Sequence, residues 1–193
     1  MSKCVEFFFD LSSPYSYLAA TQIESVVAET GAQLAWRPFV LGAVFKATGN
    51  DMPARVPAKA KYMLTDLERW AKRYGVPFRF SSHFPVNAIK AMRLAIVADR
   101  AGQGGLFIRA AFFAMWADDR DLADEGVLRD LAAQFGLDLA AIEDPAIKAA
   151  LKENTDDAIR RGSFGAPSIF VGDQFFLGND RLDFVRAALH SLP

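Results

Sequence analysis

The sequence predicts an α/β fold in which a βαβ unit and a ββα unit are separated by a long all-helical segment. Three observations lead to this prediction: two short apolar runs flank a helix near the N-terminus, helix follows helix in the middle, and two short β-type runs precede a helix at the C-terminus. A small domain interrupted by an insertion explains this order better than two consecutive domains. We therefore expect a discontinuous α/β domain of residues 1–44 and 156–193 and a helical insertion domain of residues 45–155.

The N-terminal unit has clear boundary signals. Cys4–Phe9 is short and rich in Phe and Val, which is typical of a buried strand. Ser13 is a favoured N-cap and Pro14 a favoured first helical residue, so a helix should begin there and end at Gly31. Leu34–Phe39 is the next predicted strand. The short connection predicts two parallel strands joined by a helical crossover.

The middle of the chain has helical periodicity from about residue 45 to residue 153, with glycine and proline at the breaks. The expected helices there are Ala58–Tyr74, Pro85–Ala101, Leu106–Ala117, Glu125–Phe135 and Ala146–Arg161.

The C-terminal unit follows a glycine-rich segment. Ser168–Val171 and Gln174–Phe176 are predicted strands, and Gly172-Asp173 between them is a hairpin turn signal. Leu182–Ser191 should form the last helix.

Composition excludes several classes of protein. Of the 193 residues, 52% are hydrophobic, and 22 Lys and Arg nearly balance 23 Asp and Glu, so a packed globule is favoured and nucleic-acid binding is not. Cys4 is the only cysteine, which excludes an internal disulfide and a cysteine-based zinc site; we expect no metal and a reducing cytoplasmic location. Glu6 and Asp10 interrupt the N-terminal apolar stretch, and no apolar run can span a bilayer, so no membrane partner is expected.

The first chemical signal lies at the start of the first helix. The order of elements resembles that of thioredoxin-like folds, in which a Cys-x-x-Cys motif opens this helix. Here the motif is Ser13-Pro14-Tyr15-Ser16, so dithiol chemistry is impossible. A hydroxyl at a helix N-terminus can still donate to a thiolate and lower a ligand thiol's pKa from about 8.5 towards neutrality. The alternative is that Ser13 only caps the helix.

Two further segments fit the same fold. Ala166-Pro167 stands where thioredoxin-like proteins have a cis-proline, although an ordinary trans turn is the alternative. Gly178-Asn179-Asp180-Arg181 precedes the last helix, where its amides and carboxylate could bind an ammonium-and-carboxylate ligand end. Its alternative is an ordinary N-cap.

Four motifs together resemble one enzyme family. Residues 9–17 (FDLSSPYSY), 48–50 (TGN), 164–167 (FGAP) and 176–182 (FLGNDRL) look like those of 2-hydroxychromene-2-carboxylate isomerases, relatives of the kappa-class glutathione transferases. The motifs occur in the family's order and extend over nearly the whole chain.

The resemblance implies glutathione as the cofactor. By position, the Ser13 hydroxyl would face the glutathione sulfur as the catalytic group, Ala166 before Pro167 would pair with the cysteinyl backbone, and Asn179 and Asp180 would hold the γ-glutamyl end. The implied glutathione-binding residues are Ser13, Asn50, Lys59, Ala166, Pro167, Gly178, Asn179 and Asp180.

The resemblance also implies a substrate side. Lys46 would face the substrate carboxylate, with Asn50 beside it; the alternative for Lys46 is a solvated surface lysine. His83 is either a polar substrate contact or part of a structural loop. From position alone, Phe45, Trp116 and Tyr17 are candidates for a flat aromatic pocket.

The implied reaction interconverts 2-hydroxychromene-2-carboxylate and trans-o-hydroxybenzylidenepyruvate, a small aromatic oxo-acid of aromatic degradation, by reversible thiolate addition and bond rotation. A glutathione transferase that conjugates small electrophiles and a noncatalytic glutathione-binding or protein-interaction module are the alternatives, whereas a thiol-disulfide oxidoreductase would lack both sulfurs. The resemblance further implies a homodimer.

Overall fold

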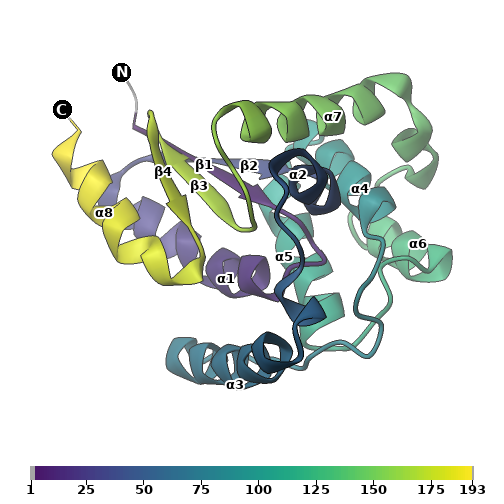
Figure 1. Cartoon of the computed structure of the whole chain (residues 1–193). Coiled ribbons are helices and arrows are strands. Elements are labelled where there is room, and N and C mark those ends of the chain that lie inside the picture. The colour runs from purple at the N-terminus through teal and green to yellow at the C-terminus, as the bar shows by residue number, and fades with distance from the viewer. Residues whose placement is uncertain (1–2, 193) are drawn as a thin grey trace.

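The computed structural model describes residues 3–192 and contains the predicted α/β arrangement (Figure 1). The βαβ and ββα units are both present, with helices between them. In chain order the elements are β1 (Cys4–Phe9), α1 (Pro14–Thr30), β2 (Gln33–Pro38), α2 (Leu41–Thr48), η1 (Pro53–Arg55), α3 (Pro57–Tyr74), α4 (Ile89–Arg100), α5 (Gly104–Trp116), α6 (Glu125–Gln134), η2 (Leu139–Glu143), α7 (Pro145–Arg160), β3 (Ser168–Val171), β4 (Gln174–Leu177), η3 (Asn179–Arg181) and α8 (Leu182–Ser191).

The four strands form one mixed sheet in the order β2-β1-β3-β4. β1 runs parallel to β2, with Phe7 opposite Trp36, which is the pairing that a βαβ unit predicts. β3 runs antiparallel to both β1 and β4. The N-terminal and C-terminal units, far apart in sequence, therefore share a single sheet.

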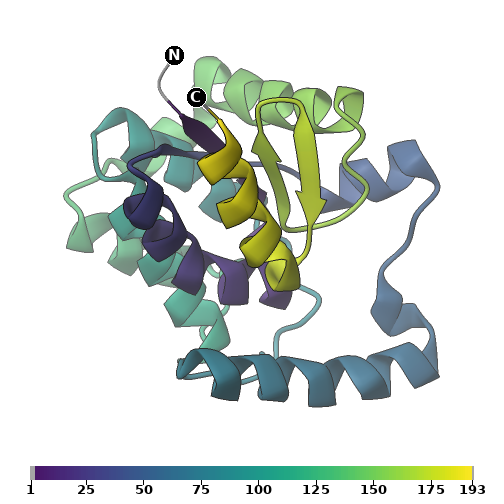
Figure 2. The ribbon, with the colours of Figure 1, turned by 90° about the vertical axis from the view of Figure 1, so that its left-hand side faces the viewer.

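Side-chain alternation along β1 builds two hydrophobic cores. Val5, Phe7 and Phe9 point into the larger core, which extends through α1, α8 and the helices of the insertion. Phe8 points to the opposite face, into a smaller core with residues of α2 and α7. The larger core is continuous between the sheet and the helical segment. The helix α3 lies at the lower edge of the molecule in both views (Figures 1 and 2).

The first helix begins and ends as the sequence predicts. Ser13 caps α1 by accepting a hydrogen bond from the Ser16 backbone N–H, and Pro14 is the first helical residue. Gly31 has a φ of 66°, the left-handed conformation that glycine adopts without steric cost, and ends the helix.

Two α-helices differ clearly from the prediction, whereas the ends of the other predicted elements agree within two residues. Residues 41–48 form α2, a helix that the sequence patterns did not indicate as an element of its own. The helix expected from Pro85 begins only at Ile89, whose backbone N–H is held by the Asn87 side chain at 3.2 Å. The Phe84–Pro85 and Ala166–Pro167 peptide bonds are both cis, the second as predicted.

Trp116 connects the insertion to the start of α1. Its indole is fully buried, and its N–H donates to the Leu11 carbonyl at 2.9 Å. Trp116→Phe leaves that carbonyl without this donor, so we expect the free energy of unfolding to fall by about 1.5 kcal/mol. Denaturant unfolding measures the loss. Trp70→Phe, at a partly buried position, is the matched control; equal losses in the two variants would contradict a special role for the Trp116 bond.

No helix within residues 3–192 is long and apolar enough to cross a membrane.

Candidate active site

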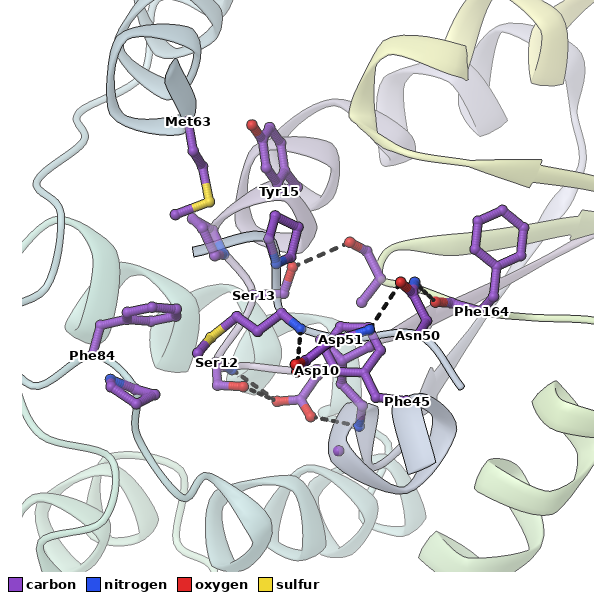
Figure 3. A pocket seen from close by; sticks show the side chains of 18 of the residues that line it. Asp10, Ser12, Ser13, Tyr15, Phe45, Asn50, Asp51, Met63, Phe84 and Phe164 are labelled. Carbon is purple, nitrogen blue, oxygen red and sulfur yellow. Dashed lines mark hydrogen bonds between the residues drawn. The ribbon is translucent and has the colours of Figure 1, made fainter. Parts of the chain in front are cut away.

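A cavity of about 1430 Å³ opens beside the N-terminus of α1. Its walls come from α1, α2 and the loop after it, α3, the loop before α4, the loop before β3, and η3. Binding pockets usually measure about 300–1,000 Å³, so this cavity has room for two small molecules at once. Figure 3 shows the part of it around Ser13.

Ser13 lies at the centre of this site. Its side chain is only 5% exposed, and its backbone N–H donates to the Asp10 carbonyl at 2.9 Å. The Ser13 hydroxyl accepts from the Ser16 N–H at 3.1 Å and donates to the Ala166 carbonyl at 3.3 Å (Figure 3). A hydroxyl at the positive end of a helix therefore lies directly beside the loop before β3 on the cavity wall.

The loop before β3 forms the part of the cavity wall next to Ser13. Gly165 and Ala166 line the cavity, whereas Pro167 does not. The Pro167 carbonyl accepts from the Gly178 backbone N–H at 3.0 Å, which connects this loop to the turn before η3.

The turn from Gly178 to Asp180 lines one end of the cavity. Gly178 has a φ of 102°, and a Cβ there would come within 2.6 Å of an Asp180 carboxylate oxygen, so the position requires glycine. Asn179 is 2% exposed, and its carbonyl accepts from the Tyr74 hydroxyl at 2.8 Å. Asp180 pairs with Arg181 at 2.6 Å. This end therefore offers a carboxylate and backbone groups to a ligand.

Lys46 and Asn50 both line the cavity, on α2 and just after it. Lys46 is exposed. The Asn50 amide donates to the Phe164 carbonyl at 2.7 Å, and its oxygen accepts from the Asp51 N–H at 2.9 Å. The first of these bonds connects the α2 side of the cavity to the loop before β3 (Figure 3).

Besides Pro167, two predicted site residues lie outside the cavity wall. Lys59 is exposed on the first turn of α3. The His83 side chain is 39% exposed, and its Nδ1 lies 3.7 Å from an Asp121 carboxylate oxygen. The segment directly after His83, residues 84–89, does line the cavity. The structure thus brings together the other predicted residues apart from Pro167, and we assign no ligand contact to Lys59 or His83.

Of the three aromatic residues expected in a flat pocket, only Phe45 lines the cavity. Trp116 and Tyr17 are buried in the core, where Trp116 stacks on Phe78. The apolar wall is built instead from side chains that the sequence patterns did not single out, namely Met52, Met63, Phe84, Val86 and Met92.

Sequence reasoning also missed polar residues of the cavity wall. Asp10 is 4% exposed and accepts three hydrogen bonds, two from Ser12 and one from the Leu41 N–H. Burial raises the pKa of the Asp10 carboxyl, although these hydrogen bonds oppose the shift. The Tyr15 hydroxyl donates to Asp66 at 3.0 Å, and burial together with this carboxylate raises the Tyr15 pKa. The only available signal was the position of Asp10 and Tyr15 within the 9–17 motif.

The chemical groups of the site thus include a helix-capping hydroxyl, a lysine, carboxylates, backbone groups and an apolar wall. Among residues 3–192 no three His, Cys, Asp or Glu side chains gather closely enough to hold a metal ion. Ser13 and Ser16 stand at the positions of a Cys-x-x-Cys motif, and Cys4 does not line the cavity. Thiol chemistry at this site therefore depends on a ligand that supplies the sulfur.

Comparison with known proteins agrees with this geometry. The model of the DSBA-like thioredoxin domain family matches residues 4–190. A 2-hydroxychromene-2-carboxylate isomerase of Sphingobium xenophagum is 37% identical over 98% of this chain and 99% of its own length. Glutathione S-transferase kappa 2 of Caenorhabditis elegans is 32% identical over 93% of this chain and 88% of its own length.

Among solved structures, a selenomethionine form of 2-hydroxychromene-2-carboxylate isomerase matches with a TM-score of 0.87 and 28% identity, over 97% of this chain and 94% of that one. By sequence and by fold, the chain therefore belongs to the family of 2-hydroxychromene-2-carboxylate isomerases, within the DSBA-like thioredoxin domain.

Proposed function

We propose that the protein is a glutathione-dependent isomerase that interconverts 2-hydroxychromene-2-carboxylate and trans-o-hydroxybenzylidenepyruvate. One observation carries this proposal: the Ser13 hydroxyl, at the N-terminus of α1, and the Ala166 carbonyl lie 3.3 Å apart on the wall of a cavity that is large enough for two ligands and has no thiol of the chain on its wall. The isomerase relative supports the reaction, and the kappa-class relative supports the cofactor.

Glutathione would lie between Ser13 and Ala166. Its cysteinyl backbone would pair with Ala166, and its γ-glutamyl end would reach Gly178, Asn179 and Asp180, where the Asp180 carboxylate attracts the ammonium group. Asn50 would contact the glycyl half from the α2 side.

The same geometry explains how the thiolate would be stabilised. The Ser13 hydroxyl donates to the Ala166 carbonyl over a long 3.3 Å. A cysteinyl N–H that donates to this carbonyl would release the Ser13 hydroxyl, which can then donate to the sulfur. Together with the N-terminus of α1, this hydrogen bond lowers the thiol pKa and raises the thiolate fraction near neutral pH.

The substrate would occupy the rest of the cavity. Its carboxylate would pair with Lys46, and its aromatic ring would contact Phe45, Met63 and Phe84. This arrangement sets the conjugated alkene beside the glutathione sulfur.

The reaction is then a reversible addition. Opening of the cyclic hemiketal breaks the ring C–O bond, forms the ketone and gives a cis enone, the hydroxyl proton passing to the phenolic oxygen. Glutathione held at Ser13 and Ala166 would supply a thiolate for reversible addition to the conjugated alkene, which would let the former double bond rotate as a single bond and would leave the trans alkene once the thiolate departs. Glutathione is regenerated.

An absorbance assay on the chromene acid tests this function. With glutathione present the purified protein should convert the chromene to the trans product, and without glutathione it should not exceed the uncatalysed rate. Turnover independent of glutathione, or no binding of millimolar glutathione in calorimetry, would contradict the proposal.

A glutathione transferase is the second candidate, favoured by the 32% identity to the kappa-class enzyme. A transferase would use the same thiolate to displace a leaving group and would consume glutathione. The isomerase should leave the total free thiol unchanged after many turnovers, which thiol titration of the reaction mixture measures. A loss of one thiol per product formed would instead identify a transferase.

We further propose a reducing, cytoplasmic setting, because reduced glutathione is the working cofactor. Family membership supports a homodimer, which sedimentation analysis can test.

A further inference from the structure

Asp10 is a buried carboxylate that lies between the N-termini of two helices. One carboxylate oxygen accepts from the backbone N–H and the hydroxyl of Ser12, at 2.9 and 2.7 Å, just before α1. The other oxygen accepts from the backbone N–H of Leu41, the first residue of α2, at 2.9 Å (Figure 3). A single side chain from the end of β1 thus connects the starts of α1 and α2.

This carboxylate has no cationic partner within residues 3–192. Burying an unpaired charge is costly, so such groups are seldom kept without compensation. Here the compensation comes from three hydrogen bonds and from the partial positive charges of two helix N-termini. The stabilisation of the Asp10 carboxylate therefore depends on the positions of both helix N-termini.

α2 depends on Asp10 more than α1 does. α1 has its own cap in Ser13, whereas the N-cap residue of α2, Val40, supplies no side-chain hydrogen bond. The Val40 backbone N–H is held by the Thr155 hydroxyl at 3.0 Å, and the Leu41 N–H by Asp10. α2 has only eight residues, so the bond at Leu41 acts on a large part of its length.

α2 also carries the substrate side of the cavity. Phe45 and Lys46 lie on it, and both line the cavity that Ser13 faces. The distance between the thiolate site on α1 and the carboxylate clamp on α2 is therefore set where the two helices begin. Asn50 has a separate connection through the Phe164 carbonyl, so the glutathione side does not depend on the Leu41 bond.

We propose that Asp10 is a positioning residue. By accepting a hydrogen bond from the Leu41 N–H, it holds α2, and with it Lys46, at a fixed position relative to Ser13. The catalytic consequence of this inference rests on the proposed isomerase function, whereas its structural consequence, an ordered α2 held by Asp10, does not.

Leu41→Pro tests the Asp10 bond by removing its donor, the Leu41 N–H, together with the leucine side chain. Leu41 is the first residue of α2, the position at which proline is favoured, and Val40 has φ −90° and ψ 100°, an extended conformation that a following proline permits. Leu41→Ala is the matched control, because it also loses the leucine side chain but keeps the N–H. The ratio between the two variants isolates the bond to Asp10.

We expect Leu41→Pro to have a kcat/KM for the chromene acid about 3- to 10-fold below that of Leu41→Ala, mainly through a higher KM. The glutathione Kd should be equal in the two variants. Loss of a merely structural bond would instead reduce the active fraction, which lowers kcat and leaves KM unchanged. Equal kcat and KM in the two variants would overturn the positioning role.

Hydrogen–deuterium exchange gives a second readout that needs no activity. Peptides covering residues 41–49 should exchange faster in Leu41→Pro than in Leu41→Ala, while peptides of α1 should not change. Equal exchange of the α2 peptides in Leu41→Pro and Leu41→Ala would refute the inference, whatever the wild-type activity is. A wild-type protein that is inactive with glutathione would refute only the proposed function.

Discussion

Ser13→Ala is expected to slow the isomerisation by about 10- to 150-fold while leaving the protein folded. The lost hydroxyl would otherwise donate to the glutathione thiolate, and a hydrogen bond to a charged group contributes about 1.5–3 kcal/mol. The loss of the N-cap alone lowers the free energy of unfolding by about 0.5–2 kcal/mol, and Pro14 keeps the first turn in its helical conformation. Steady-state kinetics with saturating glutathione measures the rate.

The pH profile separates this role from simple capping. The Ser13 hydroxyl stabilises the thiolate, so its removal raises the thiol pKa, and the alkaline rise of activity should move to higher pH. Glutathione binding should persist, because Ala166 and the turn from Gly178 to Asp180 are untouched.

Ser16→Ala is the matched control. The Ser16 hydroxyl is fully buried, has no hydrogen-bond partner within residues 3–192 and does not line the cavity. Its removal should leave both the rate and the pH profile unchanged and should not reduce stability. If Ser13→Ala behaves like Ser16→Ala in turnover, Ser13 is only a cap and the helix N-terminus alone stabilises the thiolate.

Lys46→Met is expected to lower kcat/KM for the chromene acid by about 10- to 30-fold, mostly through a higher KM. The ammonium would pair with the substrate carboxylate, and the expected effect lies at the low end for a charge-assisted bond because Lys46 is exposed in the ligand-free site. Since the pair forms with substrate in both the ground and the transition state, its loss appears mainly in KM. Steady-state kinetics over a range of chromene acid concentrations measures both constants.

Two controls accompany Lys46→Met. Lys46→Arg keeps the positive charge and should recover part of the affinity, and Lys61→Met removes an exposed lysine of α3 that does not line the cavity. The Lys46 effect should also shrink at high salt, because the pair is partly open to solvent. A Lys46→Met variant with unchanged KM would remove Lys46 from the substrate side.

Local signals in the sequence were sufficient for the parts of the fold that depend on near neighbours. Ser13 and Pro14 begin α1, Gly31 ends it, and Gly172-Asp173 joins β3 to β4, all within a few residues of the elements concerned. The 9–17 motif likewise indicated Ser13, because a capping residue and its helix are contiguous. Family motifs added the cis Ala166–Pro167 bond, which no local pattern shows.

One helix, α2, was set by distant partners and was not predicted. α2 lacks a capping side chain of its own and begins where Asp10 and Thr155, 31 and 115 residues away from their backbone partners in the sequence, hold its first N–H groups. Propensity describes single residues and short windows, so it cannot report such bonds.

By itself, the sequence determined the order of the four strands and of the α-helices other than α2, the serine at a cysteine position at the start of α1, and the family. These properties depend on residue type and local spacing, and both can be read from the amino-acid sequence. Only the tertiary structure decided that Phe45 rather than Trp116 lines the cavity, that His83 lies beside Asp121, and that Asp10 joins two helices. A buried aromatic residue and one on a cavity wall have the same local pattern, and only the packing of α2, α3 and α4 around α1 separates them.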